Sequence, residues 1–425
     1  MMFYKETNLK ETPIGRIPRD WGITKLGNFI EIETGKRAKG GALEKGSVAS
    51  IGGEHIDDEG NIRWDDMKFI PEDFYKSLKQ GKVRLGDVLL VKDGATTGKV
   101  AIVKNLKYEK AAVNEHVFIV KGKTGLLNEF LFYFLFSKFG QIQIRTRFHG
   151  LIGGIIRNDL ETILITHPPL LEQQKITEIL STIDESIQKT NEIIAKTERL
   201  KKGLMQELLT KGIGHKEFKN TEIGRIPKDW EVVRLGDVLE ICQYGLSIRM
   251  NEKGKYPIIR MDELVNGYVI PEITKYVDLD EETFRNFRLE KGDILFNRTN
   301  APDLVGRTGI FLLEGDYVFA SYLIRLRPKP TMLDPRFLTF YLVFSEDRLR
   351  QLATRAVHQA NINATNLKKV KVPRPTIEEQ QKIADIIFSF DKKLELERNE
   401  KAKLERIKKG VMDLLLTGKI RVKVH

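Results

Sequence analysis

The sequence is poor in residues that build disulfide frameworks or metal sites. One cysteine, Cys242, stands among 425 residues, which excludes a disulfide framework and a cysteine-based zinc site. The seven histidines are scattered without ligand spacing, so we expect no metal site. No stretch approaches 18 apolar residues, and the first ten residues, MMFYKETNLK, lack an apolar run. We therefore expect no signal peptide and no membrane span, and a cytoplasmic protein.

Motifs of catalysis are also missing. An amino-methyltransferase needs an Asn/Asp-Pro-Pro-aromatic loop, and the nearest stretch, His167-Pro-Pro-Leu170, differs at both ends. Acidic residues at Pro71-Glu-Asp73 lack the Glu-x-Lys spacing of a nuclease. The loop 92–99 resembles a phosphate-binding P-loop, but Asp93 and Val100 replace the residues that such a loop requires. We therefore predict a non-catalytic chain.

What the chain has is positive charge. Its formal net charge is +12 and its pI is about 9.4, which favours a polyanionic partner, nucleic acid first. A generic lysine-rich protein would carry the same charge. With 41% hydrophobic and 31% charged residues, the chain is typical of a globular protein of two or three domains.

An internal repeat runs through the whole chain. Residues 14–21 recur at 223–230 with a single Arg-to-Lys change, and the Gly-Asp-aliphatic-Leu run at 86–89 returns at 292–295. The offset stays between 206 and 209 residues, which is far too long for a solenoid. A tandem duplication with a variable block in each copy explains the pattern.

Two helices of equal length close the two copies. EQQKI opens both, at 172–176 and 379–383, and LLT closes both, at 208–210 and 415–417, each pair 207 residues apart. Apolar residues recur at steps of three and four, Ile193 and Leu200 among them, and predict rods of roughly 58 Å. Proline before each start, a capping box of Thr376 with Glu379, and glycine after each end support the helices.

The equal lengths favour an antiparallel coiled-coil pair over two ordinary surface helices. Residues 397–400 are polar and interrupt the second stripe. We predict that the packing residues are Ile176, Ile183, Ile187, Ile194, Leu204, Ile383, Phe390, Leu404 and Val411.

Each copy reads as a mixed α/β domain followed by its helix. Buried strands are predicted at 87–91, 100–103, 117–120 and 163–166, and again at 293–296, 308–313, 323–327 and 370–372. Aromatic-rich helices are predicted at 129–138 and 336–344. The expected domains are residues 1–170 and 214–377, with spacer helices at 171–213 and 378–425, related by a pseudo-two-fold axis.

Two regions of each copy carry side chains suited to phosphates and base edges. One is the loop after the first buried strand, and the other follows the aromatic-rich helix; a solvated surface is the competing interpretation of both. We predict DNA contacts from Lys92, Thr96, Thr97, Lys99, Arg145, Arg147 and His149 in the first copy, and from Asn297, Arg298, Thr299, Asn300, Arg307, Arg355, His358, Gln359 and Asn361 in the second.

The repeated motifs resemble those of the specificity subunit of type I restriction-modification systems. The resemblance rests on GRIPxxW with the Leu-Gly that follows it, and on the proline-rich runs ending in EQQKI at 168–176 and 375–383. It covers essentially the whole chain. It implies two target-recognition domains, each reading half of a bipartite DNA sequence, and antiparallel helices that fix the gap.

The resemblance also implies partners. Two modification subunits, which bind S-adenosylmethionine, would methylate adenine, and restriction subunits using ATP and Mg would cut unmodified DNA; this chain would hold no cofactor. An orphan DNA-binding scaffold and an enzyme of unrecognised type remain alternatives. Four residues inserted in both helices, near Thr190 and Glu397, should lengthen the gap by one or two base pairs.

Overall fold

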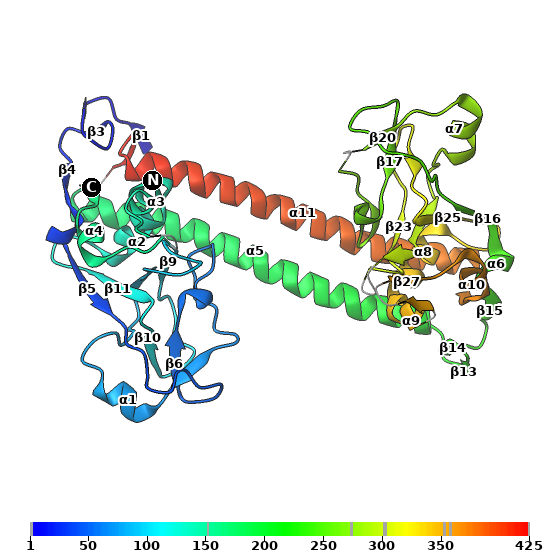
Figure 1. The fold of residues 1–425 in the computed structure, drawn as a ribbon, viewed down its shortest axis with the longest axis horizontal. Coiled ribbons are helices and arrows are strands. Elements are labelled where there is room, and N and C mark those ends of the chain that lie inside the picture. The colour runs from blue at the N-terminus through cyan, green and yellow to red at the C-terminus, as the bar shows by residue number, and fades with distance from the viewer. Residues whose placement is uncertain are drawn as a thin grey trace. The chain divides into compact units, whose positions relative to one another are not determined.

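Both ends of the chain belong to the same folded unit. In this computed structural model, which describes residues 3–150, 153–272, 275–300, 304–351, 354–356 and 359–423, unit 1 comprises Met1–Asn191 with Asn399–His425, and unit 2 comprises Glu192–Arg398. Strand β1 (Phe3–Lys5) pairs antiparallel with β29 (Ile420–Val422). The N- and C-terminal ends accordingly lie together in unit 1 (Figure 1).

Unit 1 is built on two sheets. One has the order β5-β11-β8-β9 and is antiparallel throughout. The other has the order β10-β6-β7, with β10 parallel to β6. The strands are β5 (Ile30–Thr34), β11 (Val117–Gly122), β8 (Val88–Val91), β9 (Val100–Ile102), β10 (Lys110–Val113), β6 (Val48–Ile51) and β7 (Lys68–Ile70).

Alternation along β8 divides the core of unit 1 into two layers. Val88 and Leu90 pack in one cluster with helix α2 (Asn128–Phe136), whereas Leu89 and Val91 pack in another with the second sheet. Successive side chains of a strand point to opposite faces, so a continuous apolar run gives a sheet that is buried on both sides.

Unit 2 has the same arrangement of a main sheet and a smaller sheet, but the number of strands in its main sheet differs. Its main sheet has the order β16-β25-β21-β23-β19-β18, and a smaller one has the order β20-β17-β24. The strands are β16 (Leu239–Tyr244), β25 (Leu323–Pro328), β21 (Ile294–Asn297), β23 (Thr308–Ile310), β19 (Gly267–Val269), β18 (Leu264–Val265), β20 (Tyr276–Val277), β17 (Tyr256–Ile259) and β24 (Val318–Phe319).

Strand β21 divides the core of unit 2 as β8 does in unit 1. Ile294 and Phe296 pack with helix α8 (Pro335–Phe344), and Leu295 packs with Phe319 on the other side. The predicted strands and aromatic-rich helices are therefore confirmed, apart from shifts of a few residues at their ends.

The two long helices are α5 (Leu170–Lys211) and α11 (Ile377–Leu416). Each is entered from a strand, β12 (Leu164–His167) or β28 (Lys371–Arg374), paired with β4 (Gly22–Lys25) or β15 (Glu231–Arg234). Gly212 and Gly418 follow the helix ends, and both have a φ of +67°, as the prediction of a glycine stop requires.

Shorter elements complete the units. None of the helices in the described part of the chain is long and apolar enough to cross a membrane. The remaining elements are β2 (Leu9–Lys10), β3 (Ile17–Pro18), η1 (Leu26–Asn28), η2 (Gly53–His55), α1 (Glu72–Ser77), α3 (Lys138–Arg145), α4 (Arg157–Glu161), β13 (Phe218–Thr221), β14 (Gly224–Pro227), α6 (Leu235–Val238), η3 (Met261–Glu263), α7 (Glu281–Phe287), β22 (Thr299–Asn300), α9 (Glu346–Gln351), β26 (Thr354–Ala356), β27 (Gln359–Asn361) and α10 (Ala364–Lys369).

Candidate nucleic-acid interface

The loop between β8 and β9 is held in shape by its own side chains. The Oγ1 of Thr97 donates to the carbonyl of Gly94 at 2.6 Å. Lys99 lies 2.8 Å from the carboxylate of Asp58, and its hydrogen bond lowers the pKa of that carboxyl. Thr96 is half-buried and packs on Gly53, where an added Cβ would meet its Oγ1 at 2.6 Å. Contacts within unit 1 therefore hold the loop in place.

The structure brings two of the predicted regions of unit 1 together. Lys92, from the loop, and His149 line one cavity of about 410 Å³. The N–H of Ile155 donates to the carbonyl of Lys92 at 2.7 Å and joins the two segments. Arg157 lines the same cavity, and sequence reasoning missed it. Although burial opposes the shift, the hydrogen bond to His149 at 2.9 Å helps to lower the pKa of Asp159.

The two arginines before His149 lie elsewhere. Arg145 is exposed and lines a different cavity, of about 810 Å³, beside the long helices. Arg147 donates to Thr162 Oγ1 at 2.9 Å and to the carbonyl of Gln143 at 2.8 Å, and also to the Thr162 carbonyl. These bonds hold the guanidinium against its own unit, and the DNA contact of Arg147 stays a prediction.

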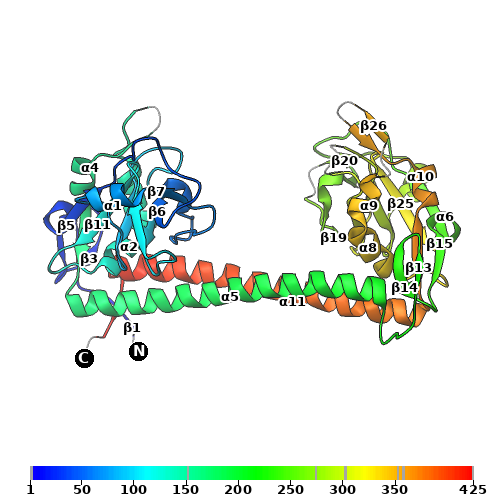
Figure 2. The same cartoon turned by 90° about the horizontal axis from the view of Figure 1, so that it is seen from below.

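In unit 2 the two predicted regions form one small sheet. Strand β22 pairs with β27, Thr299 opposite Asn361, and β27 pairs with β26. Figure 2 shows β26 at the side of this unit away from α11. The side chains of Asn300, Arg355 and Gln359, and the whole of His358, lie outside the described residues.

Two other predicted residues flank this sheet. Asn297 is completely buried, and its Nδ2 donates to the carbonyl of Leu304 at 2.8 Å. This bond ties the amide to its own loop, and the DNA contact of Asn297 stays a prediction. Arg307 is half-buried and forms no ion pair within the described residues.

The long helices pack antiparallel within each unit. In unit 1, Ile176 and Leu180 of α5 share a cluster with Val411 and Leu415 of α11. In unit 2, Leu204 and Leu208 of α5 share one with Ile383 and Ile387 of α11. Of the predicted packing residues, Ile176, Ile187 and Ile383 are buried, and the others are half-buried: Ile183, Ile194, Leu204, Phe390, Leu404 and Val411.

The buried stripe of α5 is narrower than the sequence suggested. Ile193 and Leu200 are 43% and 54% exposed, whereas Thr190 and Thr197 are buried. The buried and half-buried positions of α5 follow steps of three and four, which is the heptad spacing of a coiled coil. This seam comprises Leu180, Ile183, Ile187, Thr190, Ile194, Thr197, Lys201, Leu204 and Leu208.

A family model for the type I restriction modification DNA specificity domain matches residues 18–199 and 227–406. The chain belongs to this family. The two matches correspond to the two copies of the internal repeat, and together they cover most of the chain. Its members are non-catalytic DNA-recognition subunits of type I restriction-modification systems.

Curated relatives extend over the full length of this specificity subunit. The MjaVIII specificity subunit of Methanocaldococcus jannaschii is 32% identical, covering 100% of this chain and 98% of that protein. The EcoKI specificity subunit of Escherichia coli K12 is 21% identical, covering 96% and 90%. Among solved structures, the S subunit from M. genitalium matches with a TM-score of 0.59 at 16% identity, covering 95% and 99%. That similarity confirms the fold.

The shared motifs of the specificity subunit meet at the joint between domain and helix. The indole N–H of Trp21, from GRIPxxW, donates to Glu172, from EQQKI, at 3.0 Å. In unit 2 Trp230 donates to Glu379, also at 3.0 Å. Glycine at the end of the other helix packs beneath each ring, so that a Cβ on Gly212 would meet Trp230 at 2.8 Å. The repeated motifs are thus a structural joint.

The side chains of Glu379 and Gln380 make contacts at this joint that the sequence did not predict. Thr376 Oγ1 accepts the N–H of Glu379 at 3.3 Å, as a capping box requires. The carboxylate of Glu379, however, binds Trp230 and the N–H of Ile213, so the reciprocal half of the predicted box is absent. Gln380 holds the domain instead: its Oε1 accepts the N–H of Asp334 at 2.8 Å.

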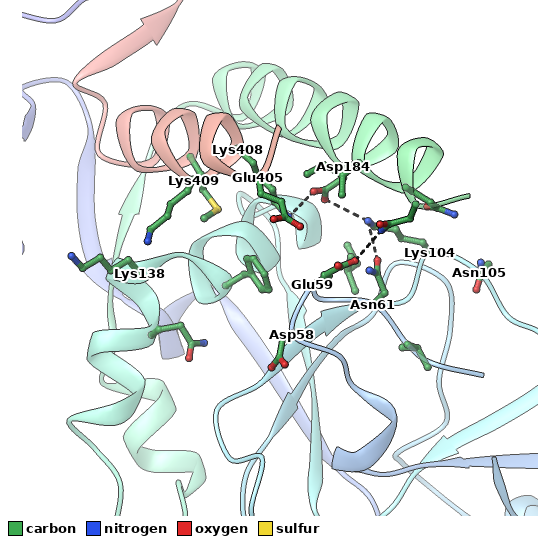
Figure 3. A pocket seen from close by; sticks show the side chains of 18 of the residues that line it. Asp58, Glu59, Asn61, Lys104, Asn105, Lys138, Asp184, Glu405, Lys408 and Lys409 are labelled. Carbon is green, nitrogen blue, oxygen red and sulfur yellow. Dashed lines mark hydrogen bonds and ion pairs between the residues drawn. The ribbon is translucent and has the colours of Figure 1, made fainter. Parts of the chain in front are cut away.

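A second lock joins both helices to each domain. Figure 3 shows Asp184 of α5 facing Lys408 of α11 and Lys104 of the domain; the distances are 2.6 and 3.4 Å. Tyr133 of α2 donates to the same carboxylate at 2.9 Å. Burial, together with Asp184, raises the pKa of Tyr133 far above its usual value, so the tyrosine stays a donor.

Unit 2 contains the equivalent lock at an offset of 207 residues. Asp391 of α11 accepts from Lys201 of α5, and Tyr268 donates to it at 2.9 Å. Tyr268 comes from β19, whereas Tyr133 comes from a helix. Sequence reasoning missed this lock, although matching Asp and Lys residues 207 positions apart were a visible signal.

Proposed function

We propose that this specificity subunit reads a bipartite DNA site, one half with each unit. In each unit, two polar segments distant in the sequence come together beside one sheet: 92–99 with His149, and β22 with β27. This convergence is the observation that carries the proposal. The joints of the two units are alike while these surfaces differ, which suits one common scaffold that reads two unlike half-sites.

We further propose that α5 and α11 set the gap between the half-sites. Their repeated segments are equal in length, and a heptad seam resists slippage because a shift would expose its apolar residues. The Asp–Lys ion pairs fix the register further, since a slipped helix would leave half-buried charges without partners.

As a type I specificity subunit, the chain works with methyltransferase and restriction subunits on DNA. We propose that two methyltransferase subunits, each with S-adenosylmethionine, methylate adenine in the site, and that restriction subunits using ATP and Mg cut unmodified DNA. Exposed apolar side chains on the helices suit protein partners: Ile193 and Leu200 on α5, and Ile407 on α11.

Mapping adenine methylation in the native genome, with and without this gene, tests the reading of DNA. Loss of one motif, made of two short half-sites around a fixed gap, is the expected result. Unchanged methylation in the deletion strain would contradict the proposal and favour a scaffold that acts without a methyltransferase.

Matched insertions in both helices, near Thr190 and Glu397, test the gap. Four extra residues turn each helix by about 40° relative to its start, and seven turn it by about 20°, so both nearly preserve the seam. We expect seven residues, about 10 Å, to lengthen the gap by about three base pairs without changing either half-site.

A five-residue insertion is the control for length. It turns each helix by about 140° and displaces the apolar stripe, so methylation should be lost and not respaced. A seven-residue variant that is folded, methylates DNA and keeps the original gap would refute the helical ruler.

A further inference from the structure

Arg298 is a fixed side chain on the candidate DNA surface of unit 2. Its Nε donates to the carbonyl of Ser321 at 2.9 Å. One of its terminal nitrogens donates to Asn361 Oδ1 at 3.4 Å. The residue is held through its backbone as well, because the N–H of Ile362 donates to the carbonyl of Arg298 at 2.8 Å. Arg298 is half-buried, and these three hydrogen bonds restrain it.

An exposed aromatic ring lies against this guanidinium. The Cζ of Arg298 lies 5.0 Å from the ring centroid of Tyr244, at the end of β16. Tyr244 is 42% exposed and is itself anchored, since its hydroxyl accepts the N–H of Ala364 at 2.8 Å. A stacked and anchored guanidinium is ordered in advance, so less side-chain entropy is lost when it binds a ligand.

Some N–H groups of the Arg298 guanidinium make no hydrogen bond to the described residues. It has five N–H groups, and two are used by Ser321 and Asn361. The second terminal nitrogen of Arg298 has no partner within the described residues, and no carboxylate there pairs with it. A planar cation with free N–H groups matches the O6 and N7 acceptors of guanine.

We propose that Arg298 reads a guanine in the half-site of unit 2, with Tyr244 and Ser321 as positioning residues. The proposal rests on the proposed function and adds a base identity to it. A phosphate contact would use the same N–H groups, and base preference separates the two, because a phosphate contact carries no direct sequence information.

The test maps methylated motifs made by the full complex of the subunit with its methyltransferase. The wild-type map comes first, because a bipartite motif there establishes the proposed function independently of Arg298. The half-site assigned to unit 2, by exchanging that unit's DNA-reading segments, must contain a G·C pair; a half-site made only of A·T pairs overturns the inference.

The variant Arg298→Gln should relax one G·C position of that half-site about 10- to 100-fold and leave the other half-site unchanged. Arg298→Lys should relax the same position less, and Tyr244→Leu should do so while Tyr244→Phe, which keeps the ring, has a smaller effect. Arg225→Gln is the matched control, because Arg225 also stacks on a ring, Phe218, at 5.0 Å but away from this surface.

Other results would overturn the inference. A uniform loss of methylation with unchanged base preference would indicate a phosphate contact. An unchanged motif and rate would indicate a side chain that only packs. Thermal unfolding of each variant guards against misfolding, and Arg298→Lys, the milder change, keeps the test decisive if Arg298→Gln does not fold.

Discussion

The two units join their domain to the long helices through the same contacts, but the residues around these contacts differ. In both, the N–H of the leucine in the Leu-Gly pair donates at 2.7 Å to the carbonyl of the residue just before a strand, from Leu26 to Ile163 and from Leu235 to Val370. In both, the following glycine leaves no room for a side chain, because an added Cβ would lie 2.8 Å from the Cβ of Glu161 at Gly27 and 2.9 Å from that of Lys368 at Gly236. The repeated motifs of this chain therefore form equivalent structural joints in the two units.

The two units differ where the repeated Gly-Asp motif lies beside different charged residues. Asp87 and Asp293 both cap their turns, accepting the N–H of Arg84 at 2.8 Å and of Glu290 at 2.9 Å. Asp293 also binds Arg327 through two bonds, of 2.7 and 2.9 Å. No ion pair joins Asp87 to another described residue, and burial raises its pKa. The aspartate at the same position of the repeated motif therefore contributes differently to the stability of the two units.

The largest effects should come from the tryptophans of the joints. Trp21→Ala and Trp230→Ala each remove a ring that is 1% exposed, and each should destabilise its own unit by about 3–5 kcal/mol. Limited proteolysis and thermal unfolding, read unit by unit, measure the change. Equal losses would support equivalent joints, and a loss confined to one unit would contradict that equivalence.

Substitutions of the two turn aspartates should give the next largest difference in unfolding free energy. Asp293→Asn leaves the buried Arg325 and the half-buried Arg327 without their carboxylate, and should cost about 3 kcal/mol. Asp87→Asn keeps an acceptor for Arg84 and removes a carboxylate whose raised pKa marks its charge as unfavourable there. Its unfolding free energy at pH 7 should change by less than about 1 kcal/mol.

The pH dependence of Asp87 has a definite sign. Its folded-state pKa is raised, so its contribution to stability is present below the unfolded pKa and is lost as the pH rises through the folded value. The Asp87→Asn variant should lack this acid-side gain in denaturant titrations. A variant that loses as much stability as Asp293→Asn at neutral pH would contradict this account.

The side chains of Arg421 and His215 at the two joints should differ by a smaller amount. Arg421 binds Glu172, Asp20 and Glu6 in unit 1, where His215 in unit 2 binds Glu379 at 2.8 Å. Arg421→Gln should therefore cost about 2 kcal/mol and His215→Gln about 1 kcal/mol. Thermal unfolding compares them, and the reverse order would show that the number of ion pairs at a joint does not set its strength.

The Asp–Lys pairs should show the smallest difference between the two units. Asp184→Asn and Asp391→Asn each keep an acceptor for the tyrosine but remove the charge facing Lys408 or Lys201, at a cost of about 1–2 kcal/mol. Exchanging the charges within one pair should recover part of the loss. Strict additivity in the double-mutant cycle of Asp184 and Lys408 would show that the pair is not coupled.

The sequence predicted the parts of the fold that repeat or alternate. Equal offsets identified the duplication, apolar steps of three and four identified α5 and α11, and continuous apolar runs identified β8 and β21. These patterns are local, because the faces of a helix or strand are set by its own period. The two segments of each unit for which DNA contacts are predicted were also visible in the sequence, though not as one surface.

The partners of polar side chains were decided only by the tertiary structure. Glu172 meets Arg421 although 249 residues separate them, and two aligned aspartates meet tyrosines from a helix and from a strand. The same approach of distant segments buried Asn297 and stacked Arg298 on Tyr244. Periodicity determines which face of an element is buried. The partner of a polar group depends instead on which distant segment packs against it, and the local sequence does not specify that segment.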